Sequence, residues 1–419
     1  MIAEGTNSQP LTIGGNEPAY RVYIMNSTIN AGESGYGVIC FVPVQAGITT
    51  GSNVVIDGLA AFYIKQDANN LSLNLGHGTY TGTNLFAKES GMFGTVVVEG
   101  KNNNITMTID AATVKAVAGD DASQASQAAF LVRGEGNTIN IKAENAQVNT
   151  EGKNAYRAIV NSDVAASTKM IEAGNELKLV AENRGYQFYS FEEAVRFAGN
   201  EGTIKIVNDF ELADTWTIPA DKKYTLDLNG KTISQTKECT ASYEMINNKG
   251  DLTITGEGKI SFKDTGAGDP NFGWGSYTVR NEGNLVVENG TIEHLGEQAF
   301  GKHCIMALYQ YSGSTTINGG TISTPNYRSA RLWKGEMTIN GGTFDGQVWA
   351  QAVDNTAKLT INGGTFEPNG NDASAVFVTN NQYDVQLAVT DGTFNGKVGC
   401  SDAAKLANAI TGGKFNAAA

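Results

Sequence analysis

The C-terminal half of the chain repeats a short pattern of alternating apolar and polar residues that ends in a pair of glycines. The pattern reads TTINGGTI, MTINGGTF and LTINGGTF, with its second glycine at positions 320, 342 and 364. In the third copy, alternation places Leu359, Ile361 and Phe366 on one side and Asn362 on the other. The pattern therefore predicts a short strand, a corner and a second short strand.

The glycine pair predicts where the chain turns. Gly363 and Gly364 can both take positive φ without steric cost, so we expect a sharp corner at each pair. Looser copies of the pattern have their glycine at Gly230, Gly258, Gly290, Gly392 and Gly413, so neighbouring copies are 21 to 32 residues apart. A period in this range is typical of a solenoid.

The fold predicted from this period is an all-β parallel β-helix. Each coil carries an upstream strand and a polar turn before the repeat, as in YEMINNKGDLTI, which gives two or three short strands per coil. The two-residue turns of a hairpin array and the Leu/Asn spacing of leucine-rich repeats are both missing. The corner residues Asn318, Asn340 and Asn362 allow two interpretations, a hydrogen-bonded side-chain ladder or simple tolerance of the turn.

The first 185 residues carry a weaker form of the pattern. Residues 1–20 show no periodicity and predict an extended arm, while 21–185 predict a β-rich region of degenerate coils or a separate β domain. Alternating strands are expected in 71–82, 105–117 and 137–148, and DDASQASQAAF, residues 120–130, in a small-polar loop.

A helix is expected over 190–198. Ser190 and Glu193 form a capping box in front of the amphipathic segment FEEAVRFA, which can cover the end of an apolar coil stack. We place a boundary near 185, so that 186–419 forms the region with the TINGGTF-type repeats.

The run SFEEAVRFAGNEGTIKIVNDFELADTWTIPADKKYTLDLNGKTIS, followed by the TINGGTF repeats, resembles a known group of proteins. It is similar to the pectate-lyase-like right-handed parallel β-helix proteins of gut bacteria and their phages, over roughly residues 186–419. The resemblance implies the fold, whereas this architecture hosts lyases, hydrolases, adhesins and phage fibres or tailspikes alike.

Composition narrows the possible partners. The chain has 30 Lys and Arg against 43 Asp and Glu, a net charge of −13, which argues against a nucleic-acid partner. The N-terminus MIAEGTNSQP carries no signal peptide pattern, and no stretch approaches 18 apolar residues, so neither export by a usual signal nor a membrane span is expected. The scattered Cys40, Cys239, Cys304 and Cys400 are expected to be reduced and to lie in the core.

Candidate catalytic residues form no recognisable group. Acidic residues are scattered, namely Asp120, Asp121, Asp264, Asp269, Asp345 and Asp354, and no paired carboxylates at catalytic spacing stand out. His294 and His303 lie close in sequence beside acidic residues, for which we prefer a surface loop over a metal or acid–base role. We expect no catalytic residues, no metal and no cofactor.

Candidate binding residues are more numerous. Aromatic and basic residues concentrate in one third of the chain, and the candidates for ligand binding are Trp274, Arg280, Tyr309, Tyr311, Tyr327, Arg328, Arg331, Trp333 and Trp349. Flat rings with guanidinium donors suit sugar rings and acidic glycans, and stacked coils can align them as a stripe. The alternative is that several of these side chains belong to the core, because strand parity is open at this point.

These observations favour a non-enzymatic virion protein, a phage fibre, tailspike-like or capsid-decorating component that binds a host-surface glycan. The N-terminal region would attach to other virion proteins. Since an open β-helix end exposes unpaired backbone groups, either 403–408 covers it as a short helix or a homo-oligomer, most simply a trimer, does so. The alternatives are a bacterial surface adhesin and a polysaccharide lyase or hydrolase.

Overall fold

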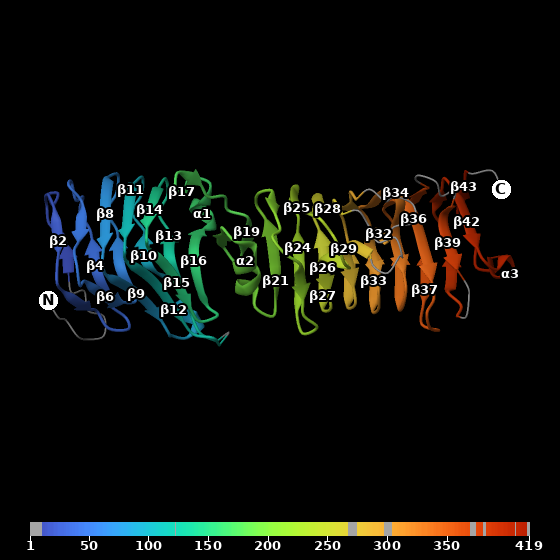
Figure 1. The fold of residues 1–419 in the computed structure, drawn as a ribbon, viewed down its shortest axis with the longest axis horizontal. Helices are drawn as coiled ribbons and strands as arrows, with labels where there is room; N and C mark the ends of the chain where they lie inside the picture. Colours follow the sequence, from blue (N-terminus) through green and yellow to red (C-terminus); the bar gives the residue numbers. More distant parts are fainter. Residues whose placement is uncertain are drawn as a thin grey trace. The chain divides into compact units, whose positions relative to one another are not determined.

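The chain folds into two compact units of stacked parallel coils, Met1–Gly199 and Asn200–Ala419 (Figure 1). The computed structural model describes residues 11–121, 123–266, 275–296, 304–368, 374–379, 383–406 and 408–416. Within each unit, strands from successive coils pair in parallel, which confirms the predicted all-β parallel β-helix. Each unit is described by itself below.

The first unit has three strands per coil, and each strand stacks on its counterpart in the next coil. The first sheet contains β1 (Leu11–Ile13), β4 (Tyr36–Cys40), β7 (Ala60–Ile64), β10 (Met92–Val98), β13 (Ser126–Val132) and β16 (Ala155–Asn161). The second contains β2 (Val22–Ile24), β5 (Ile48–Thr50), β8 (Asn70–Gly76), β11 (Asn104–Asp110), β14 (Thr138–Glu144) and β17 (Lys169–Glu172). The third contains β3 (Thr28–Asn30), β6 (Val55–Gly58), β9 (Thr79–Asn84), β12 (Thr113–Ala118) and β15 (Gln147–Glu151).

Two sequence expectations for this unit need correction. The small-polar loop expected over 120–130 is shorter, because β13 begins at Ser126 and its apolar residues are buried. The arm expected over 1–20 contains β1, which pairs in parallel with β4; residues 1–10 lie outside the described residues. Both segments have small or polar residues whose strand pairing is decided by the neighbouring coil rather than by their own pattern.

The parallel winding of the first unit ends in two antiparallel hairpins and a helix. The hairpins are formed by β17 with β18 (Asn175–Glu176) and by β19 (Ala181–Asn183) with β20 (Tyr186–Phe188). The remaining elements are η1 (Lys88–Ser90), α1 (Ser162–Ala165) and α2 (Phe191–Ala198). The helix predicted over 190–198 is thus confirmed as α2.

Helix α2 packs on the last coil of the first unit. Ser190 caps it by accepting a hydrogen bond from the backbone N–H of Glu193, as the capping box predicts. Its Phe197 packs against three rings of this unit, those of Tyr156, Tyr186 and Phe188, with centroids 5.2 to 5.7 Å apart. The contacts of α2 therefore place it in the first unit, although the sequence boundary near 185 assigns it to the second region.

The second unit repeats the same arrangement over more coils. Its first sheet contains β21 (Glu201–Ile206), β24 (Lys223–Asp227), β27 (Asp251–Thr255), β30 (Asn284–Val287), β33 (Ser314–Ile317), β35 (Glu336–Ile339), β37 (Lys358–Ile361) and β40 (Gln386–Val389). The second strand of each coil follows the corner. These strands are β22 (Phe210–Glu211), β25 (Lys231–Lys237), β28 (Gly258–Asp264), β31 (Thr291–His294), β34 (Thr321–Leu332), β36 (Thr343–Gln351), β38 (Thr365–Glu367), β41 (Thr393–Phe394) and β43 (Lys414–Phe415).

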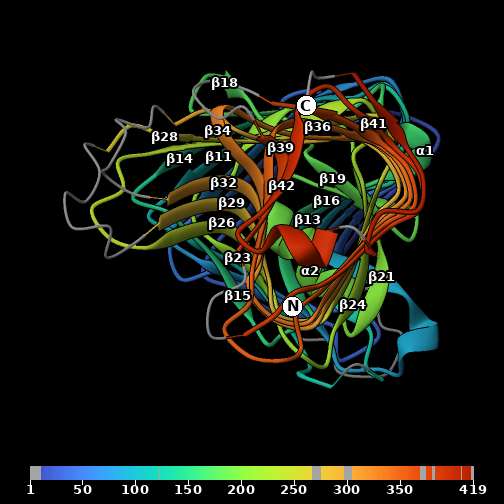
Figure 2. The ribbon, with the colours of Figure 1, turned by 90° about the vertical axis from the view of Figure 1, so that its right-hand side faces the viewer.

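The third strand of each coil of the second unit lies opposite β24 in the view along the coils (Figure 2). These strands are β23 (Trp216–Ile218), β26 (Tyr243–Asn248), β29 (Gly275–Asn281), β32 (Cys304–Gln310), β39 (Ser374–Thr379) and β42 (Lys397–Cys400). In two coils the second and third strands are continuous, because β34 and β36 pair with both sets of neighbours. The segment expected to form a covering helix contains α3 (Ala403–Leu406).

The repeat has the predicted parity. Leu359, Ile361 and Phe366 are fully buried, and Asn362 is exposed. The corner differs from the sequence expectation in one respect. Gly364 has a φ of +101°, whereas Gly363 does not take positive φ. A Cβ on Gly363 would lie 2.5 Å from the carbonyl oxygen of Asn340 in the preceding coil. The first glycine is therefore required by close backbone approach, and the second by its dihedral angle.

The corner asparagines form a hydrogen-bonded ladder, one of the two interpretations that the sequence allows. The side-chain Nδ2 of Asn362 donates to Oδ1 of Asn340 at 3.0 Å, and Nδ2 of Asn340 donates to Oδ1 of Asn318 at 2.9 Å. Asn318 donates in turn to the carboxylate of Glu288, and the hydroxyl of Thr390 donates to Asn362. Every link points toward the preceding coil, so each amide is polarised in the same direction.

A stack of phenylalanines fills the same position of successive coils. Phe344, Phe366, Phe394 and Phe415 follow one another with ring centroids 4.8 to 5.0 Å apart and nearly parallel planes. The first three are fully buried, while Phe415 is 45% exposed. The stack therefore lies in the core over most of its length and reaches solvent at its last ring.

The asparagine ladder predicts coupling between its members. We expect Asn340→Ala and Asn362→Ala each to lower the free energy of unfolding by about 1–2 kcal/mol, because each removes two hydrogen bonds. They share the Asn362–Asn340 bond, so the double variant should cost about 0.5–1 kcal/mol less than the sum of the single variants. Denaturant unfolding of the four proteins measures this coupling, and strictly additive losses would contradict the ladder.

The phenylalanine stack predicts a strong dependence on position. Phe366→Ala should lower the free energy of unfolding by about 3–5 kcal/mol, since it opens a cavity between two rings. Phe415→Ala is the matched control, with the same ring at the solvent-exposed end, and should cost no more than about 1 kcal/mol. Equal losses in thermal or denaturant unfolding would show that the buried stack does not stabilise the unit in this way.

Candidate functional site

Four predicted binding residues of the second unit lie at one register position of successive coils. Strand pairing places Arg280 beside Tyr309, Tyr309 beside Arg331, and Arg331 beside Trp349. The residue preceding each of them, for example Leu308 or Val348, is fully buried in the coil interior. Because successive side chains of a strand point to opposite faces, the column of Arg280, Tyr309, Arg331 and Trp349 lies on the outer face.

Further aromatic residues extend this column. Tyr311 and Trp333 come two residues after Tyr309 and Arg331, on the same side, and both are half-buried. The ring centroid of Tyr309 is 5.7 Å from that of Tyr311 and 4.6 Å from that of Tyr277. Together these rings form a continuous apolar patch across β29, β32 and the end of β34.

Arg331 lies among three aromatic rings. Its guanidinium carbon is 4.2 Å from the ring centre of Trp333, 4.4 Å from that of Trp349 and 5.4 Å from that of Tyr309. The side chain donates one hydrogen bond of 3.0 Å to Oε1 of Gln351, and its Nε is buried without a hydrogen-bond partner. No ion pair among the described residues involves Arg331. Its charge is therefore stabilised by ring faces and an amide.

Arg328 lies in β34, the same strand as Arg331, three residues before it. Its guanidinium carbon is 3.7 Å from the ring centre of Trp349 and 4.8 Å from that of Tyr327. It donates to the hydroxyl of Tyr327 at 2.7 Å and to the side-chain oxygen of Gln347 at 3.3 Å. Trp349 thus contacts two guanidinium groups, Arg328 and Arg331.

Arg280 differs from Arg331 because it is paired with carboxylates. Its guanidinium nitrogens lie 3.5 Å from Glu244 and 3.4 Å from Glu282, and its guanidinium carbon is 4.2 Å from the ring centre of Tyr311. Arg331 thus carries a positive charge that no carboxylate of the described residues pairs with, in a chain whose net charge is −13.

Tyr309 and Tyr277 are neutral at physiological pH. Burial raises the pKa of Tyr309 to about 12, although Arg331 and Arg280 lower it in part. Burial also raises the pKa of Tyr277, and the neighbouring Tyr309 adds to this effect. Their hydroxyl groups consequently remain available to donate hydrogen bonds.

The structure brings together eight of the nine predicted binding residues. We call them the aromatic–arginine surface, made of Arg280, Tyr309, Tyr311, Tyr327, Arg328, Arg331, Trp333 and Trp349. Trp274 lies outside the described residues. Tyr309 and Arg331 are 7% and 9% exposed, and the others are half-buried. Guanidinium groups cover several of the ring faces. A ligand on this surface would therefore meet N–H donors together with ring edges and faces.

A buried polar group was missed by sequence reasoning. His294 was expected in a surface loop, yet it ends β31 and is fully buried, with its ring centroid 5.1 Å from that of Phe262; His303 lies outside the described residues. Ser276 joins His294 Nε2 at 3.0 Å to Asp264 Oδ2 at 2.7 Å. His294 Nδ1 accepts the backbone N–H of Gly296, so Nε2 carries the proton of the neutral ring. No pattern in the sequence signals this contact.

The scattered cysteines form no disulfide. Cys40 and Cys239 are buried, as expected, while Cys304 and Cys400 are half-buried. Burial raises the pKa of the Cys40 thiol to about 12, which keeps it protonated.

The described residues contain no group of three or more His, Cys, Asp or Glu side chains arranged to hold a metal ion. Within the same part of the chain, no helix has the length and apolar character needed to cross a bilayer.

Comparison with known proteins gives no relative from which a function can be transferred. No protein-family model matches the chain, and no curated protein or solved structure is significantly similar to it. The resemblance to pectate-lyase-like β-helices thus remains an expectation.

Proposed function

We propose that this chain is a non-enzymatic binding protein whose second unit presents the aromatic–arginine surface to a glycan. The observation that carries the proposal is the register column of Arg280, Tyr309, Arg331 and Trp349 on the outer face of successive coils. A column of this kind repeats at the spacing of parallel strands, about 4.8 Å. An extended polymer lying along the stack would meet a new ring or guanidinium group at each coil.

The chemistry of the surface supports a sugar ligand. Aromatic rings pack against the C–H faces of sugar rings, and guanidinium groups donate paired hydrogen bonds to hydroxyl and carboxylate oxygens. The buried Nε of Arg331 and that of Arg280 have no hydrogen-bond acceptor among the described residues. A ligand oxygen that reaches either group would complete its hydrogen bonding, which gives binding a specific contribution beyond ring contact.

The biological setting is also part of the proposal. We propose that the chain is a virion component, a fibre, tailspike-like or capsid-decorating protein, which the first unit attaches to the particle. An immunoblot of density-purified phage particles beside washed cells and secreted fractions tests this setting. Signal in the particles would support it, and signal confined to the envelope or medium would favour a bacterial adhesin. A trimer in light scattering at micromolar concentration would support a fibre-like assembly, and a monomeric mass would contradict it.

Substitution of the central arginine and its neighbouring ring tests the binding surface. Arg331→Ala and Trp333→Ala should each weaken binding to a glycan identified on an array of host-surface polysaccharides by about tenfold, corresponding to ~1.4 kcal/mol. Tyr20→Ala is the control, because Tyr20 is an aromatic residue 71% exposed in the first unit. It should leave the affinity unchanged.

The same variants separate binding from a structural role. Circular dichroism should show that both variants keep the fold, since the surface lies outside the coil interior. A large loss of stability with unchanged glycan affinity would assign Arg331 and Trp333 to packing alone. Release of unsaturated or reducing oligosaccharides from the bound glycan would contradict the non-enzymatic part of the proposal and favour a lyase or hydrolase.

A further inference from the structure

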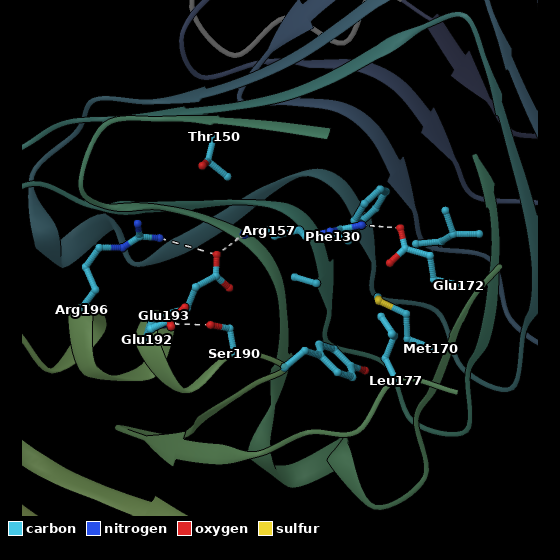
Figure 3. A pocket seen from close by; sticks show the side chains of 13 residues that line it. Phe130, Thr150, Arg157, Met170, Glu172, Leu177, Ser190, Glu192, Glu193 and Arg196 are labelled. Carbon is cyan, nitrogen blue, oxygen red and sulfur yellow. Dashed lines mark hydrogen bonds and ion pairs between the residues drawn. The ribbon is translucent and has the colours of Figure 1, made fainter. Parts of the chain in front are cut away.

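The first unit contains a pocket at the place where its parallel winding stops. The pocket has a volume of about 510 Å³ and is lined by residues of β13 to β17, by Leu177, and by residues of α2 and of the segment leading into it (Figure 3). The third sheet ends at β15, whereas the first and second continue with β16 and β17. The last coil therefore lacks its third strand, and the pocket lies beside the uncovered β15.

Polar residues replace apolar ones around this pocket. Strand pairing places Glu172 beside Ile141 and Thr150 beside Ala116, and both apolar residues are buried. Arg157 lies next to Ala129 of the preceding coil, because the residues flanking the two positions are paired. At each of these three register positions, the residue one coil earlier is apolar and buried. The residue that lines the pocket instead carries a carboxylate, a hydroxyl or a guanidinium group.

The charged groups of the pocket largely compensate one another. Arg157 lies between two carboxylates, since its guanidinium group pairs with Glu172 and its backbone N–H donates to Glu193 at 2.8 Å (Figure 3). Arg196 lies 3.6 Å from the same carboxylate of Glu193. With Glu192 included, two cationic and three anionic side chains line the space. The pocket is therefore rich in hydrogen-bonding groups but has little net charge to select an ion.

One polar atom of the pocket lacks a partner. The hydroxyl oxygen of Tyr189 is buried and has no hydrogen-bond partner among the residues that the structure describes. Buried hydroxyl groups in folded proteins are nearly always hydrogen-bonded. The adjoining wall is apolar and is formed by Phe130, Met170 and Leu177. A ligand with an oxygen near Tyr189 and C–H groups against this wall would give the hydroxyl a hydrogen-bond partner and would pack against the apolar side chains.

We propose that this pocket binds a neutral polyhydroxylated small molecule, a monosaccharide or a short oligosaccharide end. Such a ligand combines hydroxyl groups, for the Arg157–Glu172 pair and Tyr189, with an apolar C–H face for the opposite wall. The volume lies within the usual range for small-molecule sites. This site is separate from the aromatic–arginine surface, and the inference does not depend on the function proposed for that surface.

A solenoid end also needs polar residues simply to meet solvent, and terminal repeats often differ for that reason. That account explains the exchange of Ile141 for Glu172 in the column. It requires neither a concave space of this size nor a buried hydroxyl without a partner. The two together favour a ligand site over a plain end cap.

Saturation-transfer difference NMR on the full chain tests the inference, with D-glucose, D-galactose, D-mannose and N-acetyl-D-glucosamine as separate probes. At least one sugar should give saturation transfer, and titration should give its dissociation constant. Tyr189→Phe removes only the hydroxyl and should weaken that sugar about fivefold to tenfold. Ala158→Leu adds volume to a residue lining the pocket and should abolish binding.

The controls separate this pocket from the other proposed site. Arg331→Ala and Trp333→Ala should leave monosaccharide binding unchanged, and Glu172→Gln provides a second pocket variant of nearly the same shape if Ala158→Leu unfolds the protein. The absence of saturation transfer with all four sugars would overturn the inference. So would binding that survives Tyr189→Phe and Glu172→Gln unchanged in folded protein, because the sugar would then occupy another place.

Discussion

The hydrogen-bonded register between parallel strands of successive coils is the constraint on which the rest of this structure depends. Once two coils are paired, a residue within a regular stretch of strand lies directly beside one residue of the coil before it and one of the coil after it. Side chains are consequently selected as columns, as in the stacked rings of Phe344, Phe366 and Phe394 and in the amides of Asn318, Asn340 and Asn362. The same rule that repeats core residues also repeats outward-facing ones, and it can align a binding surface without any loop to carry it.

The two candidate sites use this rule in opposite ways. In the second unit, the outer face accumulates rings and guanidinium groups at one register position, while the residue that precedes each of them in its strand is apolar and buried. In the first unit, the interior columns themselves turn polar where the stack stops, and the missing strand leaves room beside them. A continuous coil stack can offer only a surface, whereas an interrupted one can also offer a pocket.

The sequence predicts the repeating parts of this fold well. The spacing of the glycine pairs, the parity of Leu359 and Ile361 and the capping residues of α2 follow from local rules, and the structure agrees with each. The positions of His294 and of the strand β13 do not follow, because each is decided by contacts with other coils. The pocket is equally invisible in the sequence, since Arg157, Glu172 and Tyr189 are brought together by strand register and by the hairpins that end the unit. For the aromatic–arginine surface, the residue types are evident from the sequence but their common face is not.

The one-way direction of the asparagine ladder bears on how such a chain can change in length. Each inner amide both donates to the preceding coil and accepts from the following one, while Glu288 at one end only accepts and Thr390 at the other donates. A duplicated copy of the 22-residue unit between Gly342 and Gly364 would bring one donor and one acceptor and would leave both ends matched. Insertion of only part of a coil would break the chain of amides. The ladder thus makes whole coils the natural unit by which this protein can be lengthened or shortened.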